Sequence, residues 1–344
     1  MKQKSLWIAG LALTLFLGGC AAKQPQTAGQ ETAAVSEAET TADSTESAMS
    51  EAAETVAEGQ KVTIAEEQVP LYAKPAYSQV RTPVASGTVT YGNGNALIDA
   101  SNANLGYVML RYSGHCGKIK VQISKDGITY TYNLRSDGNY EVFPMSEGNG
   151  YYSIKVYENV SGNQYAMIFS QDIAVTLTDA FGPFLTPNQY CNFYEGSAAV
   201  QMGAQLAATA VDDRGVVENV YNYVINNTTY DVAKAQTVQS GYLPDVDQIL
   251  ASHTGICFDY AALMVSMLRS QNVPAKLVVG YTGAQYHAWV NVYIEGVGWV
   301  DNYIYFDGTN WSLMDPTFAS SGGQSDTIKA YIGNGANYQQ KYCY

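Results

Sequence analysis

The chain has 344 residues, which is enough for two domains, and 47% of them are hydrophobic, an ordinary fraction for a globular protein. Its formal net charge is −13 at pH 7. No basic patch is found along the sequence, and this argues against nucleic acid as a partner.

Residues 1–19 have the pattern of a secretory signal peptide. Lys2 and Lys4 precede an apolar run, Leu6 to Leu17, that is too short to span a membrane in the mature protein. The run leads into Leu-Gly-Gly-Cys, which resembles the lipobox after which bacterial lipoproteins are cleaved and acylated on cysteine. We therefore predict a lipid on Cys20 and an extracytoplasmic protein anchored to the membrane at a bacterial cell surface. An uncleaved anchor or a plain secretory signal is the alternative.

Residues 20–66 have the composition of a disordered linker. After Cys20 the segment is rich in Ala, Thr, Ser, Glu and Gln, has no aromatic residue, and holds far more acidic residues than lysines. Such a stretch buries too little apolar surface to offset the entropy lost on ordering. We expect an acidic spacer that holds the folded part away from the membrane.

Residues 67–182 show short runs in which apolar and polar residues alternate, the period-two pattern of β-strands. Asp126-Gly127 and Asp137-Gly138 separate such runs and are typical of hairpin turns. Strands at this spacing, without helices, predict an all-β, Ig-like antiparallel sandwich. The strands are expected at residues 105–112, 118–124, 128–134, 151–157, 165–169 and 173–177. Their many tyrosines could form a platform for carbohydrate or peptide, but tyrosine is also favoured on any half-buried strand.

Residues 183–344 change to helical spacing followed by strands. Gly182-Pro183 and Thr186-Pro187 mark the passage into this second domain. Helices are expected at residues 197–210, 216–227 and 245–251 and again from residue 257, and strands at 275–281 and 287–294. Helices first and an antiparallel sheet afterwards predict an α+β domain.

The helix that begins near Cys257 is apolar on nearly every side from Ala262 to Arg269, so it should be buried in the core. Thr254 and Gly255 occupy the expected N-cap. Cys257 then lies in the first turn, where unpaired N–H groups and the positive end of the helix dipole favour an anion. A lone cysteine there can equally be a small buried hydrophobe.

Two later segments supply partners for this cysteine. His287 opens the run His-Ala-Trp-Val, and Asp315 lies in Trp-Ser-Leu-Met-Asp-Pro-Thr. Cysteine at a helix start, histidine at a strand start and aspartate at a strand end are the parts of a thiol triad. The motifs G-x-C-x-D-Y-A, H-A-W-V and W-x-x-M-D-P-T, in this order, closely resemble the transglutaminase-like core superfamily over roughly residues 185–320. Bacterial surface members look nearest, and the resemblance implies a papain/transglutaminase-like α+β catalytic domain.

The resemblance also implies a role for each residue. Cys257 would be the nucleophile, His287 the general base and later the acid, and Asp315 the group that orients His287. An acyl group would pass to Cys257 as a thioester, with release of an amine. The backbone N–H of Cys257 is a natural oxyanion donor. Candidates for a second donor are Gln248, Tyr242 and Tyr230, whereas Asp259 should support the helix N-terminus.

The acyl acceptor decides which enzyme this is. Water would make a cysteine peptidase or amidase, and a lysine amine would make a protein cross-linking transglutaminase. The sequence continues only briefly after the core and has no EF-hand-like acidic loop, so hydrolysis is the expectation. A non-catalytic surface binding module is the alternative from another class, but all three triad positions are filled. Peptides, proteins or cell-wall stem peptides would be the substrates.

Two aspartates compete for the place beside His287. A simple hairpin turning at Gly296-Val297 would bring Asp307 opposite His287 and Asp301 opposite Val292. Asp307-Gly-Thr-Asn, however, is typical of a turn. If residues 293–310 are instead an excursion, residues 311–315 pair with residues 287–292 and Asp315 falls beside His287. We therefore favour Asp315.

Other histidines and cysteines give weaker signals. The chain has no C-x-x-C or H-x-x-x-H pair, so no metal and no cofactor is expected. His253 could touch substrate, but a solvent-facing loop position is more typical. Cys191 and Cys343 bracket the second domain, and a disulfide between them is one hypothesis; free thiols, Cys116 included, are the other. We expect a monomer.

Overall fold

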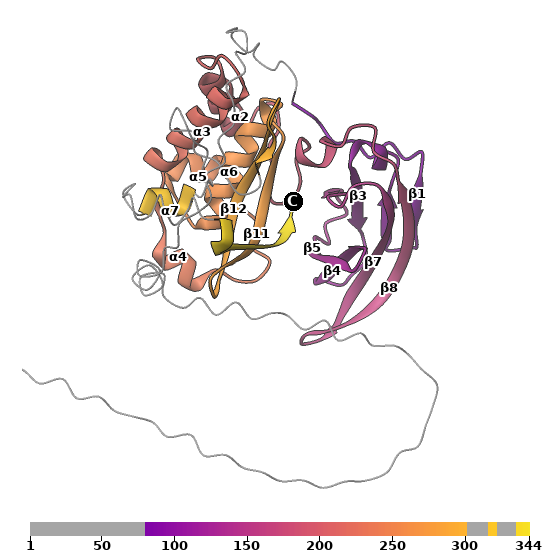
Figure 1. Cartoon of the computed structure of the whole chain (residues 1–344). Helices are drawn as coiled ribbons and strands as arrows, with labels where there is room; N and C mark the ends of the chain where they lie inside the picture. The colour runs from indigo at the N-terminus through magenta and orange to yellow at the C-terminus, as the bar shows by residue number, and fades with distance from the viewer. Residues whose placement is uncertain (1–79, 301–315, 322–334) are drawn as a thin grey trace, which may run out of the picture. The chain divides into compact units, whose positions relative to one another are not determined.

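Strands fill the first part of the described chain, and α-helices enter only after residue 197 (Figure 1). The computed structural model describes residues 80–300, 316–321 and 335–344. The signal peptide, Cys20 and the linker lie outside the described residues. Within the described residues, no helix is long and apolar enough to cross a membrane.

The β part consists of two four-stranded sheets in which every pair of neighbours is antiparallel. The first sheet has the order β1-β2-β3-β6, with β1 (Thr90–Gly92), β2 (Ala96–Asp99), β3 (Tyr107–Tyr112) and β6 (Glu141–Pro144). The second has the order β5-β4-β7-β8, with β4 (Ile119–Lys125), β5 (Ile128–Leu134), β7 (Gly150–Ser161) and β8 (Gln164–Val175). Short 3-10 helices lie at η2 (Ala103–Leu105) and η3 (Gly182–Phe184).

The sequence pattern located most of these strands. Asp126 and Gly127 form the tight turn between β4 and β5 with φ of 49° and 86°, left-handed values that suit this dipeptide. Two predicted strands, 165–169 and 173–177, are one continuous strand, β8, so their separation was wrong. Strands β1, β2 and β6 were not predicted, because three or four residues carry too little alternation to be recognised.

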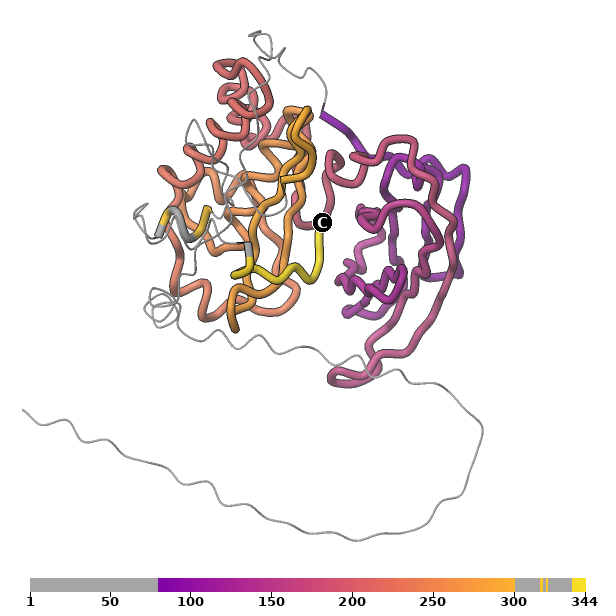
Figure 2. Tube along the Cα trace, in the orientation of Figure 1, coloured from indigo at the N-terminus to yellow at the C-terminus, as the bar shows by residue number. Residues whose placement is uncertain are grey.

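The second part mixes helices and strands, as the α+β prediction requires, and helices α2 to α6 precede the strands of its main sheet. Its elements are α2 (Ala198–Ala207), α3 (Asp213–Asn227), β9 (Thr229–Tyr230), α4 (Val232–Thr237), α5 (Val246–Ser252), β10 (Thr254–Gly255), α6 (Cys257–Ser270), β11 (Ala275–Thr282), β12 (Gln285–Ile294), β13 (Gly298–Val300), α7 (Pro316–Ser321), η4 (Gly335–Asn337) and β14 (Tyr338–Cys343). The four longer strands form an antiparallel sheet of order β13-β12-β11-β14. Strand β14 runs beside β11 although the two lie far apart in sequence (Figure 2).

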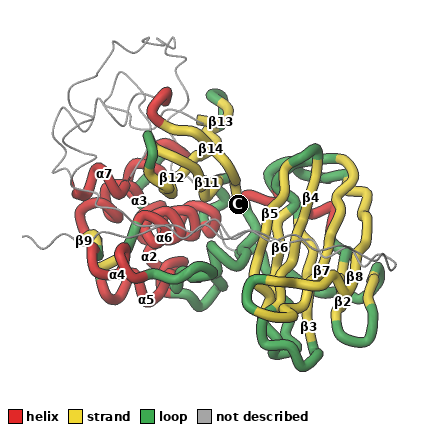
Figure 3. The backbone as a smooth tube through the Cα atoms, turned by 90° about the horizontal axis from the view of Figure 1, so that it is seen from below, coloured by secondary structure: helices red, strands yellow, loops and turns green. Residues whose placement is uncertain are grey.

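Helix α6 is the centre of the second part, and every residue from Asp259 to Ser270 is buried. It packs against α2, α3 and α5 as well as against β11 and β12 (Figure 3). The apolar run without a polar face predicted this burial correctly. Consequently the residue at the start of α6 is fixed by contacts along the whole helix.

Buried Arg269 fastens the other end of α6. Its guanidinium donates hydrogen bonds to the backbone oxygens of Ala275 at 2.9 Å, Thr186 at 2.8 Å and Tyr344 at 2.5 Å. Burial holds the pKa of this guanidinium below its ordinary value. These three bonds join the helix end to β11, to the segment before α2 and to the end of β14.

The hypothesis of a disulfide between Cys191 and Cys343 was wrong. Both residues are buried thiols that form no disulfide, and neither Cys116 nor Cys257 forms one. Burial raises the pKa of the Cys191 thiol to about 11, so this sulfur stays protonated and unreactive at neutral pH.

Candidate active site

Cys257 is the first residue of α6 and is half-buried. The N-cap is Ile256, which is extended with φ of −95° and ψ of 176°. The predicted cap was one to two residues too early, because Thr254 and Gly255 form β10 and pair in parallel with β9. Cys257 therefore lies at the N-terminal end of a buried helix, where the peptide dipoles favour an anion.

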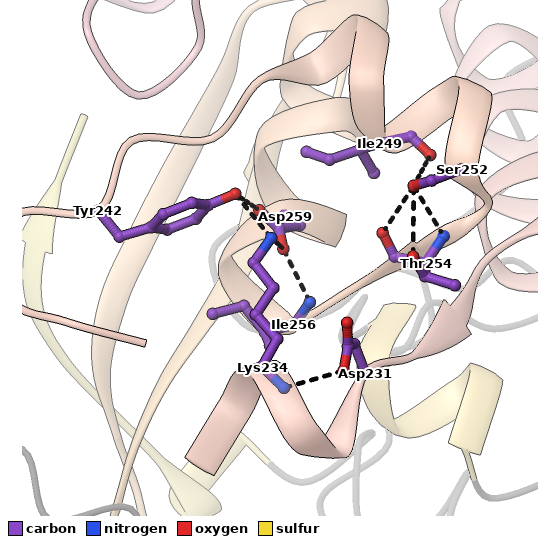
Figure 4. Close-up of polar contacts among 8 residues, drawn as sticks. All are labelled: Asp231, Lys234, Tyr242, Ile249, Ser252, Thr254, Ile256 and Asp259. Atoms are coloured by element: carbon purple, nitrogen blue, oxygen red, sulfur yellow. Dashed lines mark hydrogen bonds and ion pairs between the residues drawn. The ribbon is translucent and has the colours of Figure 1, made fainter. Parts of the chain in front are cut away.

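Asp259 holds this helix start in place (Figure 4). It is 0% exposed, and its Oδ2 accepts a hydrogen bond from the backbone N–H of Ile256 at 2.9 Å. Lys234 Nζ donates to the same oxygen at 2.5 Å, and the Tyr242 hydroxyl donates to Oδ1 at 2.7 Å. The structural role expected for Asp259 is thereby confirmed.

Tyr242 does not have the role that the sequence suggested. Its single hydroxyl proton goes to Asp259, while the hydroxyl oxygen accepts from Lys234 Nζ at 2.7 Å. Burial, together with the hydrogen bond to Asp259, raises the pKa of Tyr242 well above its ordinary value. A phenol committed in this way cannot serve as the second oxyanion donor.

Lys234 was missed by the sequence analysis. It lies on α4, a six-residue helix without a buried residue, so no apolar periodicity marks it. The Asp231 carboxylate caps this helix by accepting from the backbone N–H of Lys234 at 2.9 Å. An aspartate three residues before a lysine was the available signal for the helix start, but nothing local pointed to Asp259 as its ion-pair partner.

His287 is the third residue of β12 and is only 5% exposed. It lies opposite Gly280 of β11 in the antiparallel ladder. The indole of Trp289 stacks on its imidazole with ring centroids 6.4 Å apart and 22° between planes, so the two share one face of the strand, as the alternation predicted. Trp289 in turn meets Tyr338 of β14 edge-on at 5.2 Å. Packing therefore restricts the orientation of the histidine ring.

The elements that carry Cys257 and His287 are packed together, and Tyr286 directly precedes the histidine. Helix α6 packs against β12. Burial, then the neighbouring Tyr342 and Tyr281 and finally Cys257, raise the pKa of Tyr286 to about 12. Cys257 thus adds to the electrostatic environment of the residue that directly precedes His287. Tyr286 is still 40% exposed, so its side chain borders solvent.

The competing aspartates, Asp307 and Asp315, both lie outside the described residues. The described part of the hairpin pairs Val292 with Val300 and Ile294 with Gly298. Residues 293–300 are thus a hairpin and not a plain excursion, in a register one residue away from the one that would place Asp301 opposite Val292.

Helix α7 begins at Pro316, the residue after Asp315, and is tied to α6. The Tyr260 and Ser320 hydroxyls both donate to the backbone oxygen of Thr228, at 2.8 and 2.9 Å. Tyr260 follows Cys257 by one helical turn. The chain immediately after Asp315 is therefore held to the helix that Cys257 begins.

The remaining candidates occupy the rim of this region. Gln248 is exposed on α5, and Tyr230 of β9 is half-buried opposite Gly255 of β10. His253 has a φ of 55° at the end of α5, and its Nδ1 lies 2.8 Å from the backbone oxygen of Asn227. Across the described ranges, no group of three or more His, Cys, Asp or Glu side chains could hold a metal ion.

The comparison with known families covers the same segment. Residues 200–316 match the model described as the transglutaminase-like superfamily. These residues form a transglutaminase-like domain. The match spans α2 to the start of α7 and includes Cys257, His287 and Asp315.

Individual proteins similar to this chain are known from several bacteria. YebA, an uncharacterised protein of Bacillus subtilis (strain 168), is 32% identical over 125 residues, which cover 30% of this chain and only 16% of YebA. A candidate cysteine protease from Cytophaga hutchinsonii aligns over 69% of this chain and 83% of its own with 13% identity and a TM-score of 0.36. A candidate protease from Parabacteroides distasonis aligns over 58% and 61% with 14% identity and a TM-score of 0.27.

Proposed function

We propose that this protein is an extracytoplasmic thiol hydrolase that cleaves amide or peptide bonds through an acyl-thioester on Cys257. One observation carries the proposal. Within a transglutaminase-like domain, a half-buried cysteine begins the buried helix α6, and that helix packs on the strand that carries buried His287. The domain has a papain/transglutaminase-like α+β fold, and the sheets before it form an Ig-like sandwich.

In the first half-reaction His287 accepts the thiol proton of Cys257, and the thiolate attacks the carbonyl carbon of the substrate amide. The Cys257 backbone N–H donates to the oxyanion that forms. The C–N bond then breaks, the imidazolium gives its proton to the leaving amine, and a thioester remains. Asp315 orients the imidazole and stabilises its charged form.

In the second half-reaction His287 takes a proton from water, and the resulting hydroxide equivalent attacks the thioester carbonyl. The C–S bond breaks, the imidazolium returns its proton to the Cys257 sulfur to regenerate the thiol, and the product leaves as a carboxylic acid. A lysine amine in place of this water would give an isopeptide bond instead. The experiment must therefore distinguish hydrolysis from acyl transfer to an amine.

The lipobox-like sequence before Cys20 supports a lipid anchor on that residue, and the acidic segment after it supports a spacer. An enzyme attached in this way reaches substrates outside the cytoplasm, such as cell-wall stem peptides or surface proteins.

The test uses the full chain in detergent with muropeptides and unfolded proteins as substrates, in H₂¹⁸O and with an added primary amine. Hydrolysis predicts product carboxylates that carry one ¹⁸O, with amine adducts in the minority. Cys257→Ser should abolish turnover, whereas Cys116→Ser, at a half-buried thiol between β3 and β4, should retain it. Turnover that persists in Cys257→Ser would refute the proposal, and a majority of amine adducts would change hydrolysis to acyl transfer.

A further inference from the structure

A buried carboxylate lies two residues after the proposed nucleophile, and its neutralisation depends on one side chain from another helix. Asp259 is 0% exposed and is bonded by the Ile256 N–H, the Tyr242 hydroxyl and the Lys234 ammonium. Of these three donors only Lys234 carries a charge. Its side chain is 28% exposed, so solvent screens the ion pair only in part.

The place of α4 beside α6 is explained by these polar contacts. None of the α4 residues is buried, so apolar packing does not fix the helix there. Its start is attached by the backbone bond from Asp231 N–H to Gly255 O at 2.9 Å. Its body is attached by Lys234, whose Nζ also lies 4.4 Å from the centroid of the Tyr242 ring.

A negative charge at Asp259 without this partner would act on Cys257 in two ways. It would oppose formation of a thiolate in the same helical turn, because charges in a partly buried site are weakly screened. The Asp259 carboxylate would also lose one of the three hydrogen bonds that hold it at the first turn of α6. Both effects make the thiol of Cys257 less nucleophilic.

We infer that Lys234 is a positioning residue for the proposed thiol chemistry, acting through Asp259 to cancel the buried negative charge next to Cys257 and to hold the first turn of α6. The inference rests on the proposed function, because it assigns a support to that same nucleophile. The other titratable groups here are Tyr242, which is bonded to Asp259, and Asp245, which lies in the electrostatic environment of Tyr242. Tyr286 and His287 lie on β12, the strand that packs against α6.

The experiment measures alkylation of Cys257 by iodoacetamide from pH 5 to 10 in the full chain, with peptide mass mapping to separate it from the other cysteines. Lys234→Met should lower the alkylation rate at pH 7 about tenfold and move the pH profile about one unit upward. Lys234→Arg should restore most of the rate. Lys276→Met, which removes a lysine that lies over the Trp299 ring at 3.9 Å, is the matched control and should leave the profile unchanged.

A double variant separates charge from folding. If Lys234 acts by cancelling the Asp259 charge, Asp259→Asn in the Lys234→Met background should return the pH profile toward wild type, and Asp259→Asn alone should move it downward. A wild-type profile in Lys234→Met, or no recovery in the double variant with native circular dichroism, would overturn the inference. Alkylation needs no substrate, so a shifted profile without any amide turnover would refute the proposed function and leave this inference standing.

Discussion

Gly280 lies directly opposite His287 in the antiparallel pair of β11 and β12. A Cβ at Gly280 would come within 2.0 Å of the Gln339 backbone oxygen and 2.8 Å of the Trp289 ring. Neither the β14 backbone nor a buried indole can move aside easily in a close-packed interior. The position on β11 that lies opposite His287 therefore has no room for a side chain larger than that of glycine.

Gly280→Ala should consequently destabilise the protein by about 1–3 kcal/mol, the usual cost of overpacking. It should also lower kcat/KM at temperatures where the variant is folded, because Trp289 stacks on His287 and has to shift. Urea unfolding and initial rates check the two effects. Gly94→Ala is the control, since a Cβ there meets no atom within 4 Å. Equal urea midpoints for Gly280→Ala and wild type would contradict the packing argument.

The choice between the two aspartates is a kinetic prediction. Asp315→Ala should lower kcat on the order of 10³–10⁴-fold, because loss of the orienting carboxylate leaves the imidazole in the wrong tautomer. Asp307→Ala should be nearly silent. Near-ultraviolet circular dichroism should show both variants folded. The reverse ranking would assign the third triad position to Asp307 and would extend the β12–β13 hairpin toward His287.

Several tyrosines with raised pKa values should make the folded protein less stable at alkaline pH. Burial, as the largest cause, raises the pKa of Tyr286 and of Tyr112 to about 12, and it also raises the pKa of Tyr130 and of Tyr132. A raised folded-state pKa favours the neutral phenol, so this stabilisation is complete below pH 10 and is lost as pH rises from 10 through 12. Absorbance at 295 nm should therefore lag behind that of the urea-unfolded chain and catch up when ellipticity is lost. Complete tyrosine ionisation near pH 10 with native ellipticity would contradict this.

Lipidation is tested by mass and partitioning. The expressed protein should begin at a diacylated Cys20 and partition into the detergent phase, whereas Cys20→Ala should appear in the aqueous phase. Cys116→Ala is the control and should partition like the wild type. An unmodified Cys20, or cleavage at another residue, would end the lipoprotein interpretation.

The elements that carry Cys257 and His287 were predictable because they leave strong patterns. The α6 sequence is apolar on all sides over three turns, and β12 alternates around Trp289, so burial and period identify both. The N-cap was misplaced because Ile256 has no side-chain acceptor and Asp259 caps it from three residues later. Because threonine is a common N-cap residue, the sequence pointed to Thr254, although the capping bond is made by the side chain of Asp259.

The contacts that Lys234 and Tyr242 make with Asp259 were not predictable from local sequence. Lys234 and Asp259 are 25 residues apart and meet only because β9 and β10 pair, and two-residue strands leave no pattern. Tyr242 was a candidate oxyanion donor in the sequence, but in the fold its hydroxyl proton is donated to Asp259. Such contacts are set by tertiary packing, which neither propensity nor periodicity encodes.

The central claim, that Cys257 becomes acylated, is tested most directly by capture of the thioester. The full chain is mixed with p-nitrophenyl acetate, and samples are quenched in acid within seconds. We predict a burst of about one p-nitrophenolate per chain and one acetyl group that maps to the peptide containing Cys257, with neither in Cys257→Ser. Equal p-nitrophenolate release by wild type and Cys257→Ser, or acetyl found only on other residues, would contradict the account.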